Sequence, residues 1–152
     1  MMDTDVNKRK QIFYEDVDVG TEIPVLTKKY TLMKMALFAS MDGDWCPGHY
    51  DHKWAQEKFH QPAPFAYGMH INSHCGQLIT DWMGPNGVLN KIRTRTLGVT
   101  FPDDVVTFKG KVTGKYVKDN NKVVECEFSA EKQDGSLIAK GSAVVTLPSL
   151  SK

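Results

Sequence analysis

An aspartate and a histidine stand five positions apart in a short segment rich in glycine and proline. The segment reads MDGDWCPGHYDHKWA, residues 41–55, and carries Asp44 and His49 on either side of Pro47. Proline restricts the backbone and glycine relaxes it, so such a loop can hold two side chains at a fixed separation. A carboxylate and an imidazole directed at one point can hold a water, remove one proton from it and return a proton elsewhere. The alternative, that Asp44 caps a turn and His49 lies at the surface, is the commoner fate of a loop histidine.

A second group of side chains raises the question of a metal site. His70 and His74 stand four positions apart with Cys75 adjacent, a spacing that places both imidazoles on one helix face. The HExxH glutamate is missing, and no other carboxylate stands at a useful spacing. We therefore predict no metal site and assign these histidines to packing or to partner contacts.

Composition limits the classes of function. The chain has 152 residues and a formal net charge of +1, from 19 basic and 18 acidic side chains. This length suits one globular domain, and the charge balance argues against nucleic acid and anionic membranes as partners. The apolar stretches fall short of the roughly 20 residues that cross a bilayer, and the N-terminus MMDTDVNKRK is too polar for a signal peptide. We expect a cytoplasmic protein.

The cysteines give no sign of a covalent framework. Cys46, Cys75 and Cys126 are odd in number, widely spaced and form no CxxC pair. This pattern argues against both a disulfide scaffold and a thiolate zinc site. We expect all three thiols to be reduced.

We expect a flexible segment at residues 1–12, a single domain over 13–148 and a polar tail at 149–152. Helical patterns occur in the first half of the domain. Threonine and aspartate caps and apolar spacing predict three helices, at residues 31–40, 51–59 and 69–83. The third contains Gly76 in its interior, which costs about 1 kcal/mol relative to alanine, so we expect another element to approach that face closely.

Strand patterns fill the second half. Apolar residues alternate with polar ones, and DNN and DG supply the turns of an antiparallel meander. Strands are predicted at residues 22–27, 88–100, 105–116, 124–130 and 137–147. A helix enclosed on both sides suits a curved antiparallel sheet wrapped around it, so the predicted class is α+β.

The segment GDWCPGHYD (43–51), followed by PAPFAYGMHINS (62–73), resembles the MaoC-like (R)-specific enoyl-CoA hydratases and dehydratases, whose hallmark reads approximately GDxNPxHxD before a GM-led helix. The resemblance covers most of the chain from YEDVDVGTEI onward and implies a single hot-dog domain. It assigns catalysis to Asp44 and His49, an oxyanion contact to the Gly68 amide, and a place near the active site to Ser73. Cys46, Gly48 and Tyr67 depart from the family pattern and affect the expected substrate more than the reaction.

Hydration or dehydration of an acyl-CoA follows from the resemblance, with coenzyme A present only as part of the substrate and no other cofactor. The acyl group, the direction of the reaction and the choice of base between Asp44 and His49 stay open. Lys91, Arg93 and Arg95 alternate along one strand and are candidates for the coenzyme A phosphates, although a solvated strand face explains them more simply. An apolar tunnel for the acyl chain, or simply the core, accounts for six further side chains: Phe38, Met41, Trp45, Trp54, Phe59 and Phe65.

Two other functions share this scaffold. A hot-dog thioesterase usually carries a carboxylate on its central helix, and residues 69–80 contain none. The second alternative is a subunit that completes the pocket of an unlike partner. The stretch from Thr80 supports it, because this stretch resembles small MaoC-like chains that pair in bacterial steroid side-chain degradation. Exposed sheet edges favour a homodimer, a higher homo-oligomer or a heteromer with another MaoC-like chain.

Overall fold

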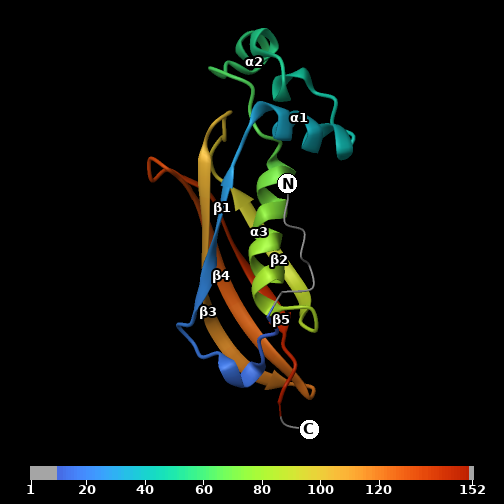
Figure 1. Cartoon of the computed structure of the whole chain (residues 1–152), viewed down its shortest axis with the longest axis vertical. Helices are drawn as coiled ribbons and strands as arrows, with labels where there is room; N and C mark the ends of the chain where they lie inside the picture. Colours follow the sequence, from blue (N-terminus) through green and yellow to red (C-terminus); the bar gives the residue numbers. More distant parts are fainter. Residues whose placement is uncertain (1–9, 151–152) are drawn as a thin grey trace.

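One curved sheet and one long helix form the body of the molecule in a computed structural model, which describes residues 10–150 (Figure 1). Two shorter helices gather at the end of the body where the long helix begins. The elements in chain order are a 3-10 turn Tyr14–Asp16, β1 Glu22–Lys29, α1 Leu32–Met41, a 3-10 turn Pro47–His49, α2 His52–Phe59, α3 Gly68–Met83, β2 Val88–Thr96, β3 Val105–Lys118, β4 Asn121–Lys132 and β5 Leu137–Thr146. The predicted α+β class is confirmed.

The sheet is antiparallel throughout, in the order β1-β3-β4-β5-β2. β3, β4 and β5 form the predicted meander, while β1 and β2 pair at its two edges. The inner face of the sheet packs on α3 through a core that includes Ile71, Leu78 and Phe108. None of the helices in residues 10–150 is long and apolar enough to cross a membrane.

The helices start where the sequence supplies caps. Thr31 accepts a hydrogen bond from the Lys34 amide before α1, and Asp51 accepts one from the Trp54 amide before α2. Each cap satisfies an amide that has no carbonyl partner within its helix. Helix α3 starts at Gly68 without a side-chain cap. The His70 amide donates to the Tyr67 carbonyl at 2.9 Å, so the Gly68 and Met69 amides are left for another acceptor.

Two glycines allow the sheet to bend over α3. Gly110, Phe128 and Gly141 lie side by side on β3, β4 and β5. A Cβ at Gly141 would come within 2.1 Å of the Arg93 carbonyl oxygen and 2.5 Å of the Phe128 ring. Only glycine fits at residue 141, because the buried Phe128 ring occupies the space that a side chain there would need.

The opposite face of α3 is open, which corrects the prediction that this helix is enclosed on both sides. A Cβ at Gly76 would meet no atom within 4 Å, and Met69 on the same side is 47% exposed. The sheet of one chain covers only the face with Ile71, Cys75 and Leu78. Gly76 is therefore not required by any close approach within residues 10–150.

The start of the described chain is anchored rather than loose. The Gln11 side chain donates to the Met83 carbonyl at 2.9 Å and accepts from the Asn86 amide at 2.8 Å. The rest of the segment expected to be flexible, residues 1–9, lies outside the described residues, as do 151 and 152 of the predicted tail. All three cysteines are free, as predicted.

These glycines give a first prediction. Gly141→Ala should lower the free energy of unfolding by about 1–3 kcal/mol because the new methyl group overlaps Phe128 and the Arg93 carbonyl. The matched control, Gly76→Ala, should raise that free energy by about 1 kcal/mol, since its methyl group enters open space and alanine favours the helix. Urea unfolding followed by circular dichroism measures both. Equal midpoints for wild type and Gly141→Ala would contradict the packing described here.

Candidate active site

The segment between α1 and α2 holds Asp44 close to the end of α1. Gly43 adopts a positive φ of 78°, and the Asp44 amide donates to the Ala39 carbonyl at 2.9 Å. One carboxylate oxygen of Asp44, Oδ1, accepts from the Cys46 amide at 2.9 Å. The expected turn cap is thus present, but it uses only one of the two oxygens. Oδ2 remains directed at His49.

His49 is buried rather than exposed, so the surface alternative for this histidine is wrong. Its residue is only 4% exposed, in the 3-10 turn Pro47–His49, and its Nδ1 lies 2.7 Å from the Phe65 carbonyl oxygen. A carbonyl oxygen can only accept, so Nδ1 carries the hydrogen. In the neutral imidazole, Nε2 then holds a lone pair.

The two candidate catalytic atoms lie close together without a hydrogen bond. His49 Nε2 is 3.4 Å from Asp44 Oδ2, beyond the usual hydrogen-bond range. Both atoms are acceptors when the histidine is neutral, so each needs a hydrogen from a third molecule. One water molecule has two hydrogens to give them. The geometry suits a water held between a base and a carboxylate.

Phe65 and Gly48 fix this arrangement from the side. The Phe65 amide donates to the Gly48 carbonyl at 3.1 Å, while the Phe65 carbonyl holds His49. A Cβ at Gly48 would lie 3.0 Å from the rings of both Phe59 and Phe65. This contact gives a physical reason for glycine at a position where the family pattern has an aliphatic residue.

The site lies beside the first turn of α3. The His49 ring is 5.6 Å from the ring of Tyr67, the residue directly before Gly68. A hydrogen bond from the Tyr67 hydroxyl to the Asp42 carboxylate raises the pKa of the tyrosine. A Cβ at Gly68 would meet nothing within 4 Å, so the space next to this amide is open. The Gly68 and Met69 amides, which make no hydrogen bond among the described residues, and the positive end of the helix dipole favour negative charge there.

Ser73 is not brought to the pair. It is exposed on α3, and its hydroxyl donates to the Met69 carbonyl one turn earlier at 2.8 Å. That hydroxyl therefore already serves the helix backbone. The proposed role of Ser73 next to the substrate stays a prediction.

Apolar side chains near the pair are open to solvent. Met41 is 87% exposed and Trp45 is 70% exposed, directly on either side of the Asp42–Asp44 turn. The core interpretation of these two residues is wrong for the single chain, and their contact with the acyl chain stays a prediction. Trp54 and Phe59 of α2 are each 42% exposed.

The predicted phosphate contacts lie on another face. Arg93 pairs with Ser142, Ser142 with Glu127, and Glu127 with Lys111, so these side chains form one row across the sheet. Gly110, next to Lys111, faces Leu78 of α3, so this row faces away from the helix.

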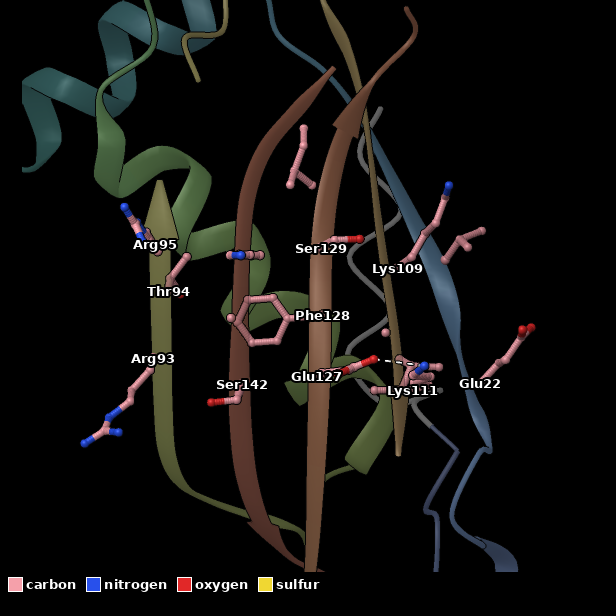
Figure 2. A pocket seen from close by; sticks show the side chains of 16 residues that line it. Glu22, Arg93, Thr94, Arg95, Lys109, Lys111, Glu127, Phe128, Ser129 and Ser142 are labelled. Atoms are coloured by element: carbon pink, nitrogen blue, oxygen red, sulfur yellow. Dashed lines mark ion pairs between the residues drawn. The ribbon is translucent and has the colours of Figure 1, made fainter. Parts of the chain in front are cut away.

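Arg93 and Arg95 line a hollow of about 760 Å³ on the outer face of the sheet (Figure 2). The hollow contains no histidine, and the ion pair Lys111–Glu127 at 2.9 Å crosses it. It offers cations but no acid–base pair of the kind found at Asp44 and His49. A contact of Lys91, Arg93 and Arg95 with coenzyme A phosphates stays a prediction.

His70 and His74 serve packing, as expected. The His70 ring stacks on Phe38 with centroids 4.3 Å apart, and Tyr30 Oη lies 2.7 Å from His74 Nδ1. Burial lowers the pKa of His70 to about 4 and that of His74 to about 3. These neutral rings join α1 to α3 beneath the site.

A different group of side chains that could hold a metal ion was missed in the sequence. Among residues 10–150, one such group comes together: the ligand atoms of Asp44, Cys46 and His49 all lie within 4.8 Å of one another. Asp44 and His49 were paired in the sequence, but the absence of a CxxC or HExxH spacing gave no reason to join Cys46 to them.

One comparison with known proteins identifies a family. A family model described as the MaoC like domain matches residues 15–133. The solved structures that resemble the chain include the following three. The (R)-hydratase from A. caviae involved in PHA biosynthesis is 25% identical, with a TM-score of 0.77 over 88% of this chain and 99% of that chain. The R-hydratase PhaJ1 from Pseudomonas aeruginosa is 23% identical, with a TM-score of 0.81 over 91% and 87%. A chain of the ChsH1–ChsH2 complex from Mycobacterium tuberculosis is 20% identical, with a TM-score of 0.75 over 86% and 98%.

The comparison with curated protein sequences gives no match. The predicted hot-dog fold and the resemblance to MaoC-like proteins are both confirmed by the family match and the structural likeness.

The hydrogen bond to Phe65 predicts the tautomer of His49. At pH 8 the hydrogen should reside on Nδ1, because the Phe65 carbonyl can only accept. Long-range ¹H–¹⁵N correlation spectra of the ¹⁵N-histidine protein distinguish the two ring nitrogens, and loss of one signal set in His49→Gln assigns them. An Nε2–H tautomer would contradict this description of the site.

The buried histidines predict a loss of stability in acid. The unfolded chain takes up protons near pH 6.5, whereas folded His70 and His74 take them up near pH 4 and pH 3. The free energy of unfolding should therefore fall as the pH drops from 6.5 toward 4, by up to about 1.4 kcal/mol per histidine per pH unit. Urea unfolding at several pH values measures this slope. His70→Phe keeps a ring on Phe38 and should flatten the slope; an unchanged slope would count against the low pKa of His70.

Proposed function

Since the chain belongs to the MaoC-like family of hydratases and dehydratases, we propose that it is a hydro-lyase acting on acyl-CoA thioesters. It adds water across the 2,3 double bond of an enoyl-CoA, or removes water from the (R)-3-hydroxyacyl-CoA, in the cytoplasm and without a further cofactor. The observation that carries the proposal is the pair of acceptor atoms, His49 Nε2 and Asp44 Oδ2, held 3.4 Å apart. This pair can activate one water molecule.

In the hydration direction, the water lies between the two acceptors. His49 takes one proton as the water oxygen bonds to the β carbon, and the Asp44 carboxylate holds the second hydrogen. The electrons of the double bond move through the α carbon to the thioester oxygen, which becomes an enolate. The proton taken up by His49 is then passed through Asp44 to the α carbon, which restores the neutral imidazole and the carboxylate; the two roles can also be exchanged. Dehydration is the same path in reverse.

The negative charge on the thioester oxygen needs preorganised donors. The Gly68 amide begins α3 beside Tyr67, whose ring is 5.6 Å from that of His49. An amide at a helix N-terminus points its hydrogen at an incoming anion, and one such donor is worth about 3 kcal/mol in comparable sites. Gly68 is thus the proposed oxyanion contact, with Ser73 a secondary candidate for substrate contact.

The exposed apolar surface points to the side of the site that meets the acyl group. Met41 and Trp45 flank the turn that carries Asp44, and both are more than two-thirds exposed in the single chain. Lys91, Arg93 and Arg95 remain the proposed contacts for the coenzyme A phosphates, because none of their side chains is held by a carboxylate within residues 10–150.

We propose that the chain acts as a homo-oligomer or together with another MaoC-like chain. β1 and β2 are sheet edges in the single chain, and the open face of α3 carries the exposed Met69. Two structural neighbours are complexes of unlike chains, ChsH1–ChsH2 and HadBC, both from Mycobacterium tuberculosis. A hot-dog thioesterase is disfavoured because residues 69–80 carry no carboxylate.

The activity test uses the purified chain with 2-enoyl-CoA substrates of short, long and steroid size. Loss of the conjugated-thioester absorbance reports hydration, and a thiol reagent reports any release of coenzyme A. Asp44→Asn and His49→Ala should each lower kcat/KM at least about 100-fold, the usual contribution of one acid–base group. Asp44→Asn keeps the shape of the side chain and the turn cap while removing the charge.

His52→Ala is the matched control, because His52 is an exposed histidine three positions from His49 that makes no contact with Asp44. It should keep the wild-type rate. Hydration that survives Asp44→Asn in a folded protein would refute the assigned pair. Release of coenzyme A without hydration would favour the thioesterase. Inactivity with every substrate would remove the self-sufficient enzyme and direct the search to an unlike subunit by co-purification.

A further inference from the structure

Cys46 changes what the Asp44–His49 pair can hold. The thiol of Cys46 is partly exposed, and its sulfur lies within 4.8 Å of ligand atoms of both Asp44 and His49. The three side chains offer a sulfur, an imidazole nitrogen and a carboxylate oxygen. These are the ligand types that Zn²⁺ binds in proteins, and three protein ligands leave its fourth position open.

One of the distances between the ligand atoms fits a tetrahedral ion. Ligand atoms about 2.0–2.3 Å from a zinc ion lie roughly 3.3–3.8 Å from one another in a tetrahedron. His49 Nε2 and Asp44 Oδ2 are 3.4 Å apart. The Cys46 sulfur lies within 4.8 Å of the ligand atoms of both residues, on the short turn that carries all three.

The surroundings of the ligands are also those of a metal site. A histidine ligand usually donates its other ring N–H to a carbonyl, which fixes the ring and directs its lone pair at the metal. His49 does so through Nδ1 to the Phe65 carbonyl at 2.7 Å, and it is only 4% exposed. Asp44 Oδ1 accepts from the Cys46 amide, which leaves Oδ2 for the ion. Nε2 faces Asp44 Oδ2 at 3.4 Å, so both atoms point at the same space.

We propose that Asp44, Cys46 and His49 form a Zn²⁺ site, and that the bound ion inhibits the enzyme. The inhibition rests on the proposed function: the lone pairs of Nε2 and Oδ2 that activate water become metal ligands, so neither can accept a proton. Binding itself depends only on the three side chains. Zinc is thus a regulator that competes with catalysis at one pair of atoms, and the thiol of Cys46 makes that competition effective.

Binding is tested on the full chain, freed of metal with a chelator and kept reduced. Calorimetry with ZnCl₂ should show one ion per chain with a dissociation constant in the micromolar range or tighter. Co²⁺ should give the visible bands of a tetrahedral ion together with a thiolate charge-transfer band. Cys46→Ser should remove the charge-transfer band and weaken Zn²⁺ binding at least tenfold, and His49→Ala should also weaken it. His52→Ala, which changes an exposed histidine outside the site, should change neither.

Inhibition is measured separately, as the Zn²⁺ concentration that halves each variant's own metal-free rate. This concentration should rise at least tenfold in Cys46→Ser, and a chelator should restore the wild-type rate. If the metal-free protein shows no hydratase activity, the proposed function fails, but the Co²⁺ spectrum still tests the metal site. The two failures are therefore distinguishable. A Co²⁺ spectrum that Cys46→Ser leaves unchanged, or an active enzyme that Zn²⁺ stimulates or leaves unaffected, overturns the proposal.

Discussion

The candidate site depends on the hydrogen bond between His49 Nδ1 and the Phe65 carbonyl. This 2.7 Å contact joins the turn after α1 to the loop that leads into α3. It fixes three properties at once: the orientation of the ring, the tautomer, and the position of the lone pair on Nε2. The reciprocal bond from the Phe65 amide to the Gly48 carbonyl prevents the two segments from sliding past each other. The tautomer of the neutral imidazole, with its lone pair on Nε2 next to the Asp44 carboxylate, is then a consequence of backbone geometry.

The rest of the fold keeps this junction in place from below. The Ala66 amide donates to the Thr100 carbonyl, which ties the segment before α3 to the chain that follows β2. Helix α3 is held against the sheet by the core, where Gly141 gives space to the Phe128 ring and Gly110 gives space to Ile23 and Leu78. The rings of Phe38, His70 and Tyr30 connect α1 to α3 beneath the site. These contacts hold α1 and the turn that carries His49 against the start of α3.

Local patterns in the sequence predicted the elements well, and long-range contacts explain where the predictions failed. The caps at Thr31 and Asp51 predict helix starts because each bonds to an amide three residues away. Strict alternation along the predicted strand 105–116 would place Tyr116 on the same face as Phe108 and Val112. Tyr116 is instead 40% exposed, because the register shifts between Val112 and Gly114 and reverses the alternation.

The same distinction applies to the site. Asp44 and His49 were found because they are close in sequence and match a family motif. The burial of His49 and its bond to Phe65 were not, because they require a contact across sixteen positions. The exposure of Met41 and Trp45 was also missed, since a hydrophobic side chain in sequence does not reveal whether its own chain covers it.

Position 46 shows how such a site can change without loss of its geometry. Residue 46 supports Asp44 through its backbone amide, which every residue except proline supplies. Its side chain is therefore free to differ from the asparagine common in the family, provided that it fits the partly exposed turn. A thiol at this position leaves the acid–base pair intact and adds a third ligand within reach of both atoms. The backbone at position 46 keeps the Asp44–His49 pair in place, so the side chain of residue 46 can determine which ligand competes with water for the pair.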